Sequence, residues 1–181
     1  MSLVFLLGGA RSGKSALAVR LAERSGLPVT FLATAEARDE EMAERIARHR
    51  AARPAGWTTI EEPVDLGGAL DHVATGSCLV LDCVSLWVAN ALERRLDEAA
   101  ISEQADDVAA RVARRQPLGV VVSNEVGLGI VPVSDLGRRY RDLLGRVNAI
   151  WAEAASEAAL VAAGRLLPLA RPASVFGELG G

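Results

Sequence analysis

The sequence predicts an α/β protein built on a mostly parallel sheet that is flanked by helices. Two apolar segments, residues 3–7 and 29–33, are separated by a helical segment, and this order spans about thirty residues. Such a unit crosses over with a right hand, which makes its two strands parallel. Short apolar segments recur at 78–82 and 118–122, as expected for strands buried on both faces.

The length of the chain fits a single domain covering residues 1–181, which is long enough to bury a substantial core. Because 50% of the residues are hydrophobic and only 4% are aromatic, Leu, Val and Ala must fill most of that core. The formal net charge of −3 argues against a general nucleic-acid binder. No basic segment precedes the first apolar run, so we expect no secretory signal, no membrane span and a cytoplasmic location.

The first apolar run leads into a glycine turn that fits the phosphate-binding pattern G-x-x-x-x-G-K-[ST]. Glycines allow the backbone N–H groups to point inward, so a polyphosphate meets several donors and the positive end of a helix. Lys14 is expected to neutralise the outer phosphates, and the Ser15 hydroxyl to bind Mg²⁺. The predicted loop consists of Gly8, Gly9, Ala10, Arg11, Ser12, Gly13, Lys14 and Ser15.

The alternative is an ordinary glycine turn between a strand and a helix. The flanking segments favour the phosphate loop, because residues 3–7 read as a buried strand. Residues 16–24 contain neither Gly nor Pro and place Leu17 and Leu21 four apart, as in a helix. The predicted fold class is therefore a P-loop nucleotide-binding α/β fold.

Ligands collect at the carboxyl ends of parallel strands, which places further candidates near the loop. The strand 29–33 ends at Ala33, Thr34 and Ala35, and the strand 78–82 ends in Asp82, a candidate ligand of Mg²⁺. The strand 118–122 runs into a loop at 123–132 whose Glu125 is either solvated or part of the site. Cys78 and Cys83 form no CxxC pair and adjoin no histidine cluster, so we expect core residues.

The remaining segments complete the predicted architecture. Pro168 places the last strand at an edge, because proline cannot donate to a central ladder. The tail at 171–181 contains Pro and Gly and is expected to be loosely held. The other expected elements are a strand at 57–61, helices at 66–73, 85–95, 97–115 and 135–155, and late strands at 159–164 and 166–169.

The segment 39–53 is predicted to be a helix with acidic residues first and basic residues last, as the helix dipole favours. His49 lies on its apolar stripe with Met42 and Ile46. A histidine in that position is commonly a hydrogen-bonded core residue. The alternative is a nucleophile, because surrounding guanidinium groups disfavour the imidazolium form and leave a neutral ring nitrogen. Arg50 and Arg53 would then hold phosphate oxygens.

These motifs resemble those of the bifunctional adenosylcobinamide kinase/adenosylcobinamide-phosphate guanylyltransferases of cobalamin biosynthesis, over residues 3 to 169. The loop at 123–132 is much more specific to this family than the phosphate loop is. The similar stretches are 8–15, 33–35, 39–42 with Arg45, Ile46 and His49, then Arg53, Trp57, Thr59 and Glu61, then Asp82, Cys83, Leu86, Trp87 and Asn90, then 123–132, and finally Arg141, Asp142, Gly145 and Asn148.

The resemblance implies phosphorylation of adenosylcobinamide with ATP or GTP, followed by transfer of GMP from GTP to the resulting phosphate through a guanylylated histidine. By motif that histidine is His49. The resemblance also implies a RecA-like fold, a homotrimer and Mg²⁺ bound with the nucleotide. The residues expected to bind GTP and its metal are Gly8 to Ser15, Ala33, Thr34, Ala35, Arg50, Ala51, Ala52, Arg53, Glu61 and Asp82, with Ser15 and Asp82 as metal ligands.

The chain departs from the family pattern at Val133, where many relatives have Glu, and at Ala149, where Gln is common. Two other functions compete with the one that the resemblance implies. One is a small-molecule kinase that uses the phosphate loop and no histidine. The other is a RecA-like regulatory or motor ATPase, which would need a basic surface or an additional domain that this chain does not supply.

Overall fold

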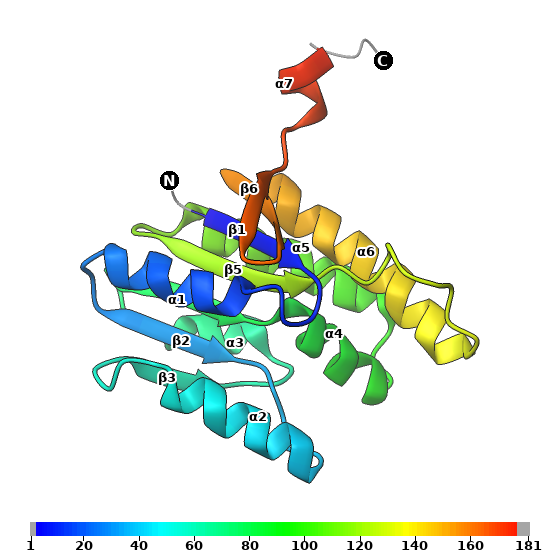
Figure 1. Ribbon diagram of the computed structural model, residues 1–181, viewed down its shortest axis with the longest axis horizontal. Helices are drawn as coiled ribbons and strands as arrows, with labels where there is room; N and C mark the ends of the chain where they lie inside the picture. Colours follow the sequence, from blue (N-terminus) through cyan, green and yellow to red (C-terminus); the bar gives the residue numbers. More distant parts are fainter. Residues whose placement is uncertain (1–2, 177–181) are drawn as a thin grey trace.

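The computed structural model describes residues 3–176 and contains a seven-stranded sheet in the order β3-β2-β4-β5-β1-β6-β7 (Figure 1). Every neighbouring pair is parallel except β6 and β7, which are antiparallel. This confirms the predicted class, a mostly parallel α/β sheet. The strands are β1 (Leu3–Gly8), β2 (Val29–Ala33), β3 (Thr58–Glu61), β4 (Cys78–Asp82), β5 (Gly119–Asn124), β6 (Glu157–Ala162) and β7 (Arg165–Pro168).

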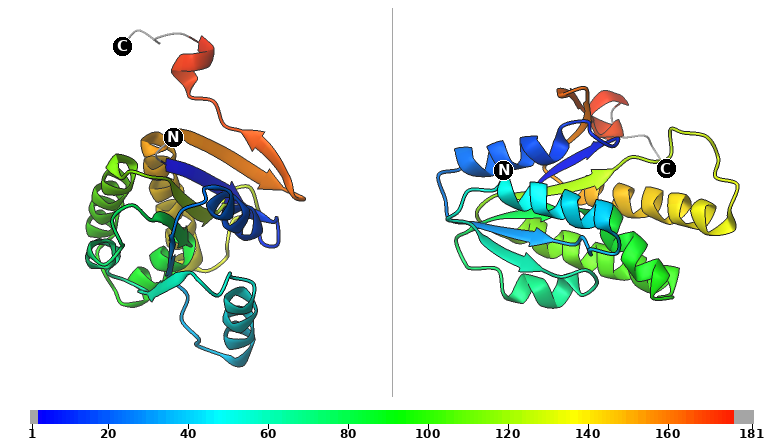
Figure 2. Two further views of the ribbon diagram at one scale, coloured as in Figure 1. Left: turned by 90° about the vertical axis from the view of Figure 1, so that its left-hand side faces the viewer. Right: turned by 60° about the horizontal axis from the view of Figure 1, so that its bottom comes forward.

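The helices cover both faces of the sheet (Figure 2). The alternation of side chains along β1 shows the division: Phe5 packs with α3 to α6 on one face, whereas Leu6 packs with Ala18 of α1 on the other. The helices are α1 (Lys14–Arg24), α2 (Glu40–Ala51), α3 (Leu66–Asp71), α4 (Val84–Glu93), α5 (Glu98–Arg114), α6 (Asp135–Ala154) and α7 (Pro172–Phe176).

The central strands β1, β4 and β5 are continuous apolar runs because helices cover both of their faces. Their carboxyl ends meet at one edge of the sheet, which is where the phosphate loop begins. The helix α2 differs from the other long helices, since none of its residues is buried. It lies at the periphery near β3 (Figures 1 and 2).

The last part of the chain forms a hairpin followed by a short helix. Ala163 and Gly164 both have positive φ, at 50° and 74°, and form the tight turn between β6 and β7. Pro168 lies in the edge strand, as predicted. The sequence analysis expected a loosely held tail and did not predict α7, whose Ser174 N–H donates to the Arg171 carbonyl at 2.9 Å. The predicted looseness of residues 177–181 lies outside the described residues.

Along residues 3–176, no helix combines the length and apolar composition that crossing a bilayer would require.

Candidate active site

The phosphate loop depends on two glycines for different reasons. A Cβ on Gly8 would lie 2.4 Å from the carbonyl oxygen of Val161 in β6, so the close approach of two strands excludes any side chain. Gly13 has φ 99°, a left-handed conformation that side chains rarely adopt, and it precedes the first turn of α1. Together they allow the chain to turn from β1 into a helix whose N-terminus faces the end of the sheet.

The loop is held by backbone hydrogen bonds from two neighbouring turns. The Gly164 N–H donates to the Ser12 carbonyl at 2.9 Å, and the Glu125 N–H donates to the Gly8 carbonyl at 3.1 Å. The Ser12 hydroxyl is buried and has no partner within the described part of the chain. The turn after β6 and the loop after β5 therefore support the phosphate loop.

Lys14, the only lysine in the sequence, lies under this loop and is only 7% exposed. Its ammonium group donates to the Gly9 carbonyl at 2.9 Å, which closes the loop on itself. Burial lowers the pKa of Lys14, while the charge of Asp82 acts in the opposite direction. A buried cation with one neutral acceptor is a strong site for an incoming phosphate.

Asp82 and Asn124 end the strands next to the phosphate loop. Because β5 lies between β1 and β4, Asn124 is paired in register with Gly8, and Val122 with Asp82. The Asn124 amide donates to the Ser85 hydroxyl at 2.9 Å, and its backbone carbonyl accepts from Asn148 at 3.0 Å. Asn124 contacts the candidate site and was missed as a site residue; its position as the last residue of a buried strand was the available signal.

Thr34 contributes to the structure beneath the site. It is fully buried, and its hydroxyl donates to the Cys83 carbonyl at 2.8 Å while accepting from the Cys83 N–H at 2.9 Å. These bonds join the ends of β2 and β4. Its neighbours Ala33 and Ala35 face the site, whereas the Thr34 side chain does not line it. The Cys83 thiol is buried as predicted, and burial raises its pKa to about 11, so it is not a thiolate nucleophile.

Asn90 of α4 anchors the segment between β2 and α2. It is 4% exposed, donates to the carbonyls of Thr34 at 2.8 Å and Pro63 at 3.1 Å, and accepts from Arg38 at 2.8 Å. Arg38 also pairs with Glu36 at 2.6 Å and with Glu93. The base of α2 is therefore attached to the core even though the helix itself buries none of its residues.

We expect Asn90→Ala to lower the free energy of unfolding by about 2 kcal/mol, since it leaves two inner carbonyls without a donor. Arg94→Ala is the matched control: its ion pair with Glu36 lies at the surface, so its loss should lower stability much less than the loss of Asn90 does. Urea denaturation of both variants provides the measurement. Equal losses in the two variants would contradict the assignment of Asn90 as the anchor.

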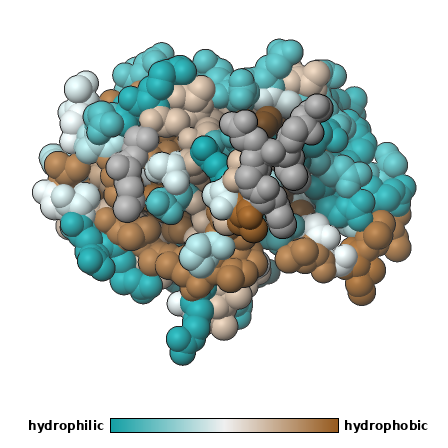
Figure 3. Space-filling model, turned by 90° about the horizontal axis from the view of Figure 1, so that it is seen from above, coloured by the Kyte–Doolittle hydropathy of each residue, from teal (hydrophilic) through white to brown (hydrophobic). Residues whose placement is uncertain are grey.

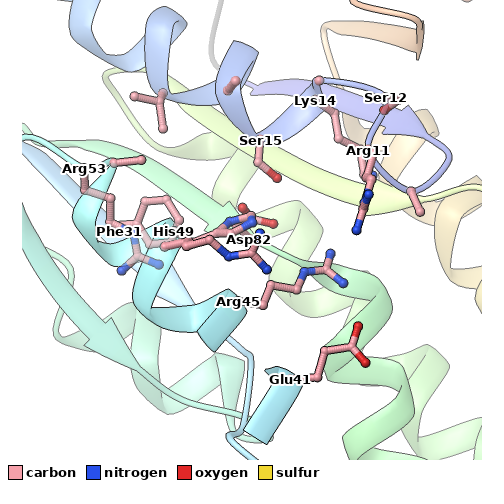
Figure 4. Close-up of a pocket in the computed structure, with 16 residues that line it drawn as sticks. Arg11, Ser12, Lys14, Ser15, Phe31, Glu41, Arg45, His49, Arg53 and Asp82 are labelled. Carbon is pink, nitrogen blue, oxygen red and sulfur yellow. The ribbon is translucent and has the colours of Figure 1, made fainter. Parts of the chain in front are cut away.

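The apolar stripe of α2 faces an open cleft. Met42, Ile46 and His49 are half-buried and line the hollow between this helix and the phosphate loop. The expectation of a core histidine is therefore not met, because α2 has no buried residue. The His49 ring lies on the wall of the cleft that faces Ser15 and Asp82 (Figure 4).

Arg53 lies at the back of the cleft on an aromatic platform. Its guanidinium group is 3.7 Å from the centre of the Phe31 ring, which in turn stacks on Trp57 at 6.4 Å. Its Nε and Nη1 atoms are shielded from solvent and have no acceptor among the described residues, and burial lowers the pKa of this arginine. Two oriented donors without acceptors fit an anionic ligand. Arg50, in contrast, forms an ion pair with Glu61.

The cleft has a volume of 520 Å³, and a smaller hollow of 50 Å³ adjoins it. Five cationic side chains and only two carboxylates line the larger part, although the whole chain carries a net charge of −3. Such a local excess of positive charge favours a polyanionic ligand. The charged residues are Arg11, Lys14, Arg45, Arg48 and Arg53, with Glu41 and Asp82.

The structure brings most of the predicted site residues into this region. Ala10 to Ser15, His49, Ala52, Arg53 and Asp82 line the cleft, and Ala33, Ala35 and Glu61 line the adjoining hollow. Gly8, Gly9, Thr34, Arg50 and Ala51 line neither part. The sequence prediction did not include Glu41, Arg45 and Arg48, although their spacing from His49 on one helix was visible. Glu125 lines neither part, and its carboxylate accepts from the Gly127 N–H at 2.5 Å.

The donors present suit a magnesium ion that is shared with a nucleotide. The Ser15 hydroxyl and the Asp82 carboxylate face the same part of the cleft (Figure 4). No group of three or more metal-ligating side chains occurs between residues 3 and 176. Magnesium is commonly bound by one or two protein oxygens together with substrate phosphates and water, so these residues fit such an ion.

A phosphate loop, an acidic strand end and a cationic cleft at the end of a parallel sheet define a P-loop nucleotide-binding enzyme. The model of the family described as cobinamide kinase / cobinamide phosphate guanyltransferase matches residues 4–169. The chain therefore belongs to this family, which confirms the resemblance and the expected class of enzyme.

Three known proteins show the same similarity over nearly their whole length. The bifunctional adenosylcobalamin biosynthesis protein CobP of Pseudomonas aeruginosa is 46% identical over 171 residues, which cover 91% of this chain and 95% of that protein. The bifunctional adenosylcobalamin biosynthesis proteins CobU of Escherichia coli and Salmonella typhimurium are 37% and 38% identical over 175 residues. Those alignments cover 90% of this chain and 96% of each relative.

Proposed function

We propose that this chain phosphorylates adenosylcobinamide with ATP or GTP and then transfers GMP from GTP to the product through His49. One observation carries the proposal: the half-buried His49 ring and the phosphate loop line the same cationic cleft. An imidazole that lines this cleft would supply the nitrogen nucleophile that the second reaction requires. The family to which the chain belongs supports both reactions.

In the first reaction a substrate hydroxyl attacks the γ-phosphorus of the nucleotide. The bond between the γ-phosphorus and its bridging oxygen breaks, the hydroxyl loses its proton, and a nucleoside diphosphate leaves. Lys14 and the N–H groups of residues 9–15 would stabilise the charge that collects on the leaving phosphates. Mg²⁺, held by Ser15, Asp82 and the phosphates, would neutralise part of that charge when bound.

In the second reaction a neutral nitrogen of His49 attacks the α-phosphorus of GTP, and pyrophosphate leaves. A phosphate oxygen of adenosylcobinamide phosphate then attacks the same phosphorus, the P–N bond breaks, and the imidazole recovers its electron pair. The covalent intermediate replaces one displacement between two anionic reactants with two successive displacements. Lys14 and Arg53 would hold the pyrophosphate, since both have donors shielded from solvent that contact no anionic partner within residues 3–176.

GTP labelled on either the α- or the γ-phosphate tests this function directly. We expect the α-label to remain on the protein in acid-labile form and the γ-label to move to adenosylcobinamide. Transfer of the γ-label alone, with no α-label on the protein, would favour the plain kinase. Hydrolysis without transfer to either acceptor would favour the regulatory ATPase.

Glu61 is proposed to select guanine by accepting its N–H groups. Its carboxylate lies at the end of β3, lines the adjoining hollow, and is oriented by Arg50. We expect Glu61→Gln to reduce the preference for GTP over ATP, because a neutral amide accepts less strongly from guanine. Competition between the two nucleotides in guanylyl transfer measures this ratio, and an unchanged ratio would contradict the assignment.

We also propose that the chain is a single cytoplasmic domain that assembles as a homotrimer. The one continuous sheet supports a single domain. Assembly is supported by the loop between β5 and α6, where Ile130 is 96% and Val133 is 98% exposed. Hydrophobic atoms gather at the right-hand edge of Figure 3, on the side where Figure 1 shows this loop. Light scattering on the purified protein tests the trimer, and a monomer would exclude it.

A further inference from the structure

We propose that Arg11 and Arg45 form a second anion subsite, which holds the phosphomonoester of the acceptor beside His49 while GMP is transferred. This inference rests on the proposed function and assigns a binding site to its second substrate. The subsite consists of guanidinium groups, whereas the outer phosphates of GTP are expected to lie against the Lys14 ammonium group and the backbone N–H groups of the loop.

The first support is the absence of partners for these two side chains. Eight arginines within residues 3–176 form ion pairs, among them Arg94 with Glu36, Arg111 with Asp71, and both Arg139 and Arg146 with Glu98. Within residues 3–176, neither Arg11 nor Arg45 has a carboxylate within 4.0 Å or a hydrogen-bond acceptor. Guanidinium groups recognise phosphate in a bidentate manner, so two arginines without ion-pair partners fit a phosphomonoester.

The second support is the backbone of Arg11. This residue has φ 57°, in the left-handed region where a non-glycine residue is costly, although the same loop uses glycine at Gly13. An arginine in a conformation that favours glycine therefore indicates that its side chain has a function. Figure 4 shows the Arg11 side chain reaching from the phosphate loop into the cleft, where it is placed to bind an anion.

The third support is the position of Arg45 relative to the nucleophile. It precedes His49 by four residues on α2, so the two side chains share one face of the helix. Arg45 reaches into the cleft from the wall opposite Arg11 (Figure 4). Burial is the largest cause of the lowered pKa of Lys14, and the charge of Arg45 lowers it further, so Arg45 acts on the phosphate loop across the cleft.

An anion held between the two walls would lie next to the histidine that carries GMP. The transfer step needs such help, because a phosphate dianion must approach a phosphoryl group that is already negative. One phosphate oxygen forms the new P–O bond, the P–N bond to His49 breaks, and the ring leaves with its electron pair. No other reactant is consumed. Lys14 and Arg53 are then free to release pyrophosphate before the acceptor reacts.

The test compares two reactions of the same guanylylated protein. Exchange of labelled pyrophosphate into GTP reports the first displacement and its reversal. Transfer of GMP from the isolated adduct to adenosylcobinamide phosphate, or to inorganic phosphate as a minimal acceptor, reports the second. We expect Arg45→Ala and Arg11→Asn to slow transfer to both acceptors by about tenfold to hundredfold, the loss typical of a charge-assisted hydrogen bond. Pyrophosphate exchange should fall by a smaller factor than transfer in the same proteins, because the acceptor phosphate takes no part in the first displacement.

Arg20→Ala is the matched control, because this exposed arginine of α1 lies outside the cleft and should leave both rates unchanged. Arg45→Lys should recover part of the transfer rate, since it keeps the charge and loses the bidentate geometry. Equal losses of exchange and transfer would place both arginines on pyrophosphate and overturn the subsite. Unchanged transfer would overturn it as well. Absence of any adduct in the unaltered protein would instead refute the proposed function.

Discussion

Replacing His49 with alanine is expected to abolish the covalent adduct that forms between the protein and the α-phosphate of GTP. The reason is chemical: His49 is the one histidine among the described residues that line the cleft, and an imidazole nitrogen is the nucleophile that the second reaction uses. Cys83 does not substitute for it, because burial holds its thiol protonated. Intact-protein mass after incubation with GTP and Mg²⁺ is the measurement, with one added GMP expected before the substitution and none after it.

Two substitutions sharpen this experiment. His72, the only other histidine, is exposed at the end of α3 and lies outside the cleft, so His72→Ala should form the adduct as fully as the unaltered protein. The kinase step should persist in His49→Ala, since transfer of the γ-phosphate uses the phosphate loop and a substrate hydroxyl. An adduct that survives in His49→Ala would point to Lys14, the only lysine, and would contradict the histidine route.

The local patterns in the sequence predicted the central strands well because those strands are buried. The boundaries of β2 and β4 agree with the predictions, since β4 is a continuous apolar run and β2 is apolar except for Thr30. The order of strands was not predictable in the same way. The insertion of β5 between β1 and β4 depends on contacts between distant segments, and this is what brings Asn124 to the site.

The phosphate loop was predictable because its chemistry lies in consecutive residues. Arg50 of α2 was not predictable in the same way, because its role depends on a partner elsewhere in the chain. Arg50 was expected to hold phosphate, yet its position directs it to Glu61 on β3. Arg45 faces the cleft because it is four residues from His49. The same helical spacing that placed His49 on one face with Ile46 also places Arg45 on that side of the helix.

Thr34 shows a different limit of sequence reasoning. It follows a strand that ends at the site, which made it a reasonable candidate for nucleotide binding. Side chains alternate along an extended segment, so its neighbours Ala33 and Ala35 face the hollow while Thr34 points into the core. Its hydroxyl bonds to Cys83 then join two strands. A polar residue at the end of a strand can therefore either line a site or, like Thr34, hold together the strands beneath it.

Replacing Lys14 with methionine is expected to reduce both guanylylation and phosphorylation by at least about a hundredfold, the loss typical of removing one preorganised donor to a developing charge. Both reactions place negative charge on phosphates held by the same loop, so they should fall together. Burial lowers the pKa of Lys14, which means that the unfolded chain holds this proton more tightly than the folded one. The free energy of unfolding therefore gains from this group as pH rises through the window between the lowered pKa and the ordinary value of 10.5.

Below that window the folded protein contains a buried cation whose only hydrogen-bond partner among the described residues is the Gly9 carbonyl. Methionine fills similar space without a charge, so Lys14→Met should lose activity at neutral pH without losing stability. Urea denaturation should give a free energy of unfolding no more than about 1 kcal/mol below that of the unaltered protein, the value of one hydrogen bond. The rise in stability at alkaline pH should disappear in the variant. A variant that loses activity because it unfolds would show that Lys14 supports the fold and would remove the argument that its burial serves the nucleotide.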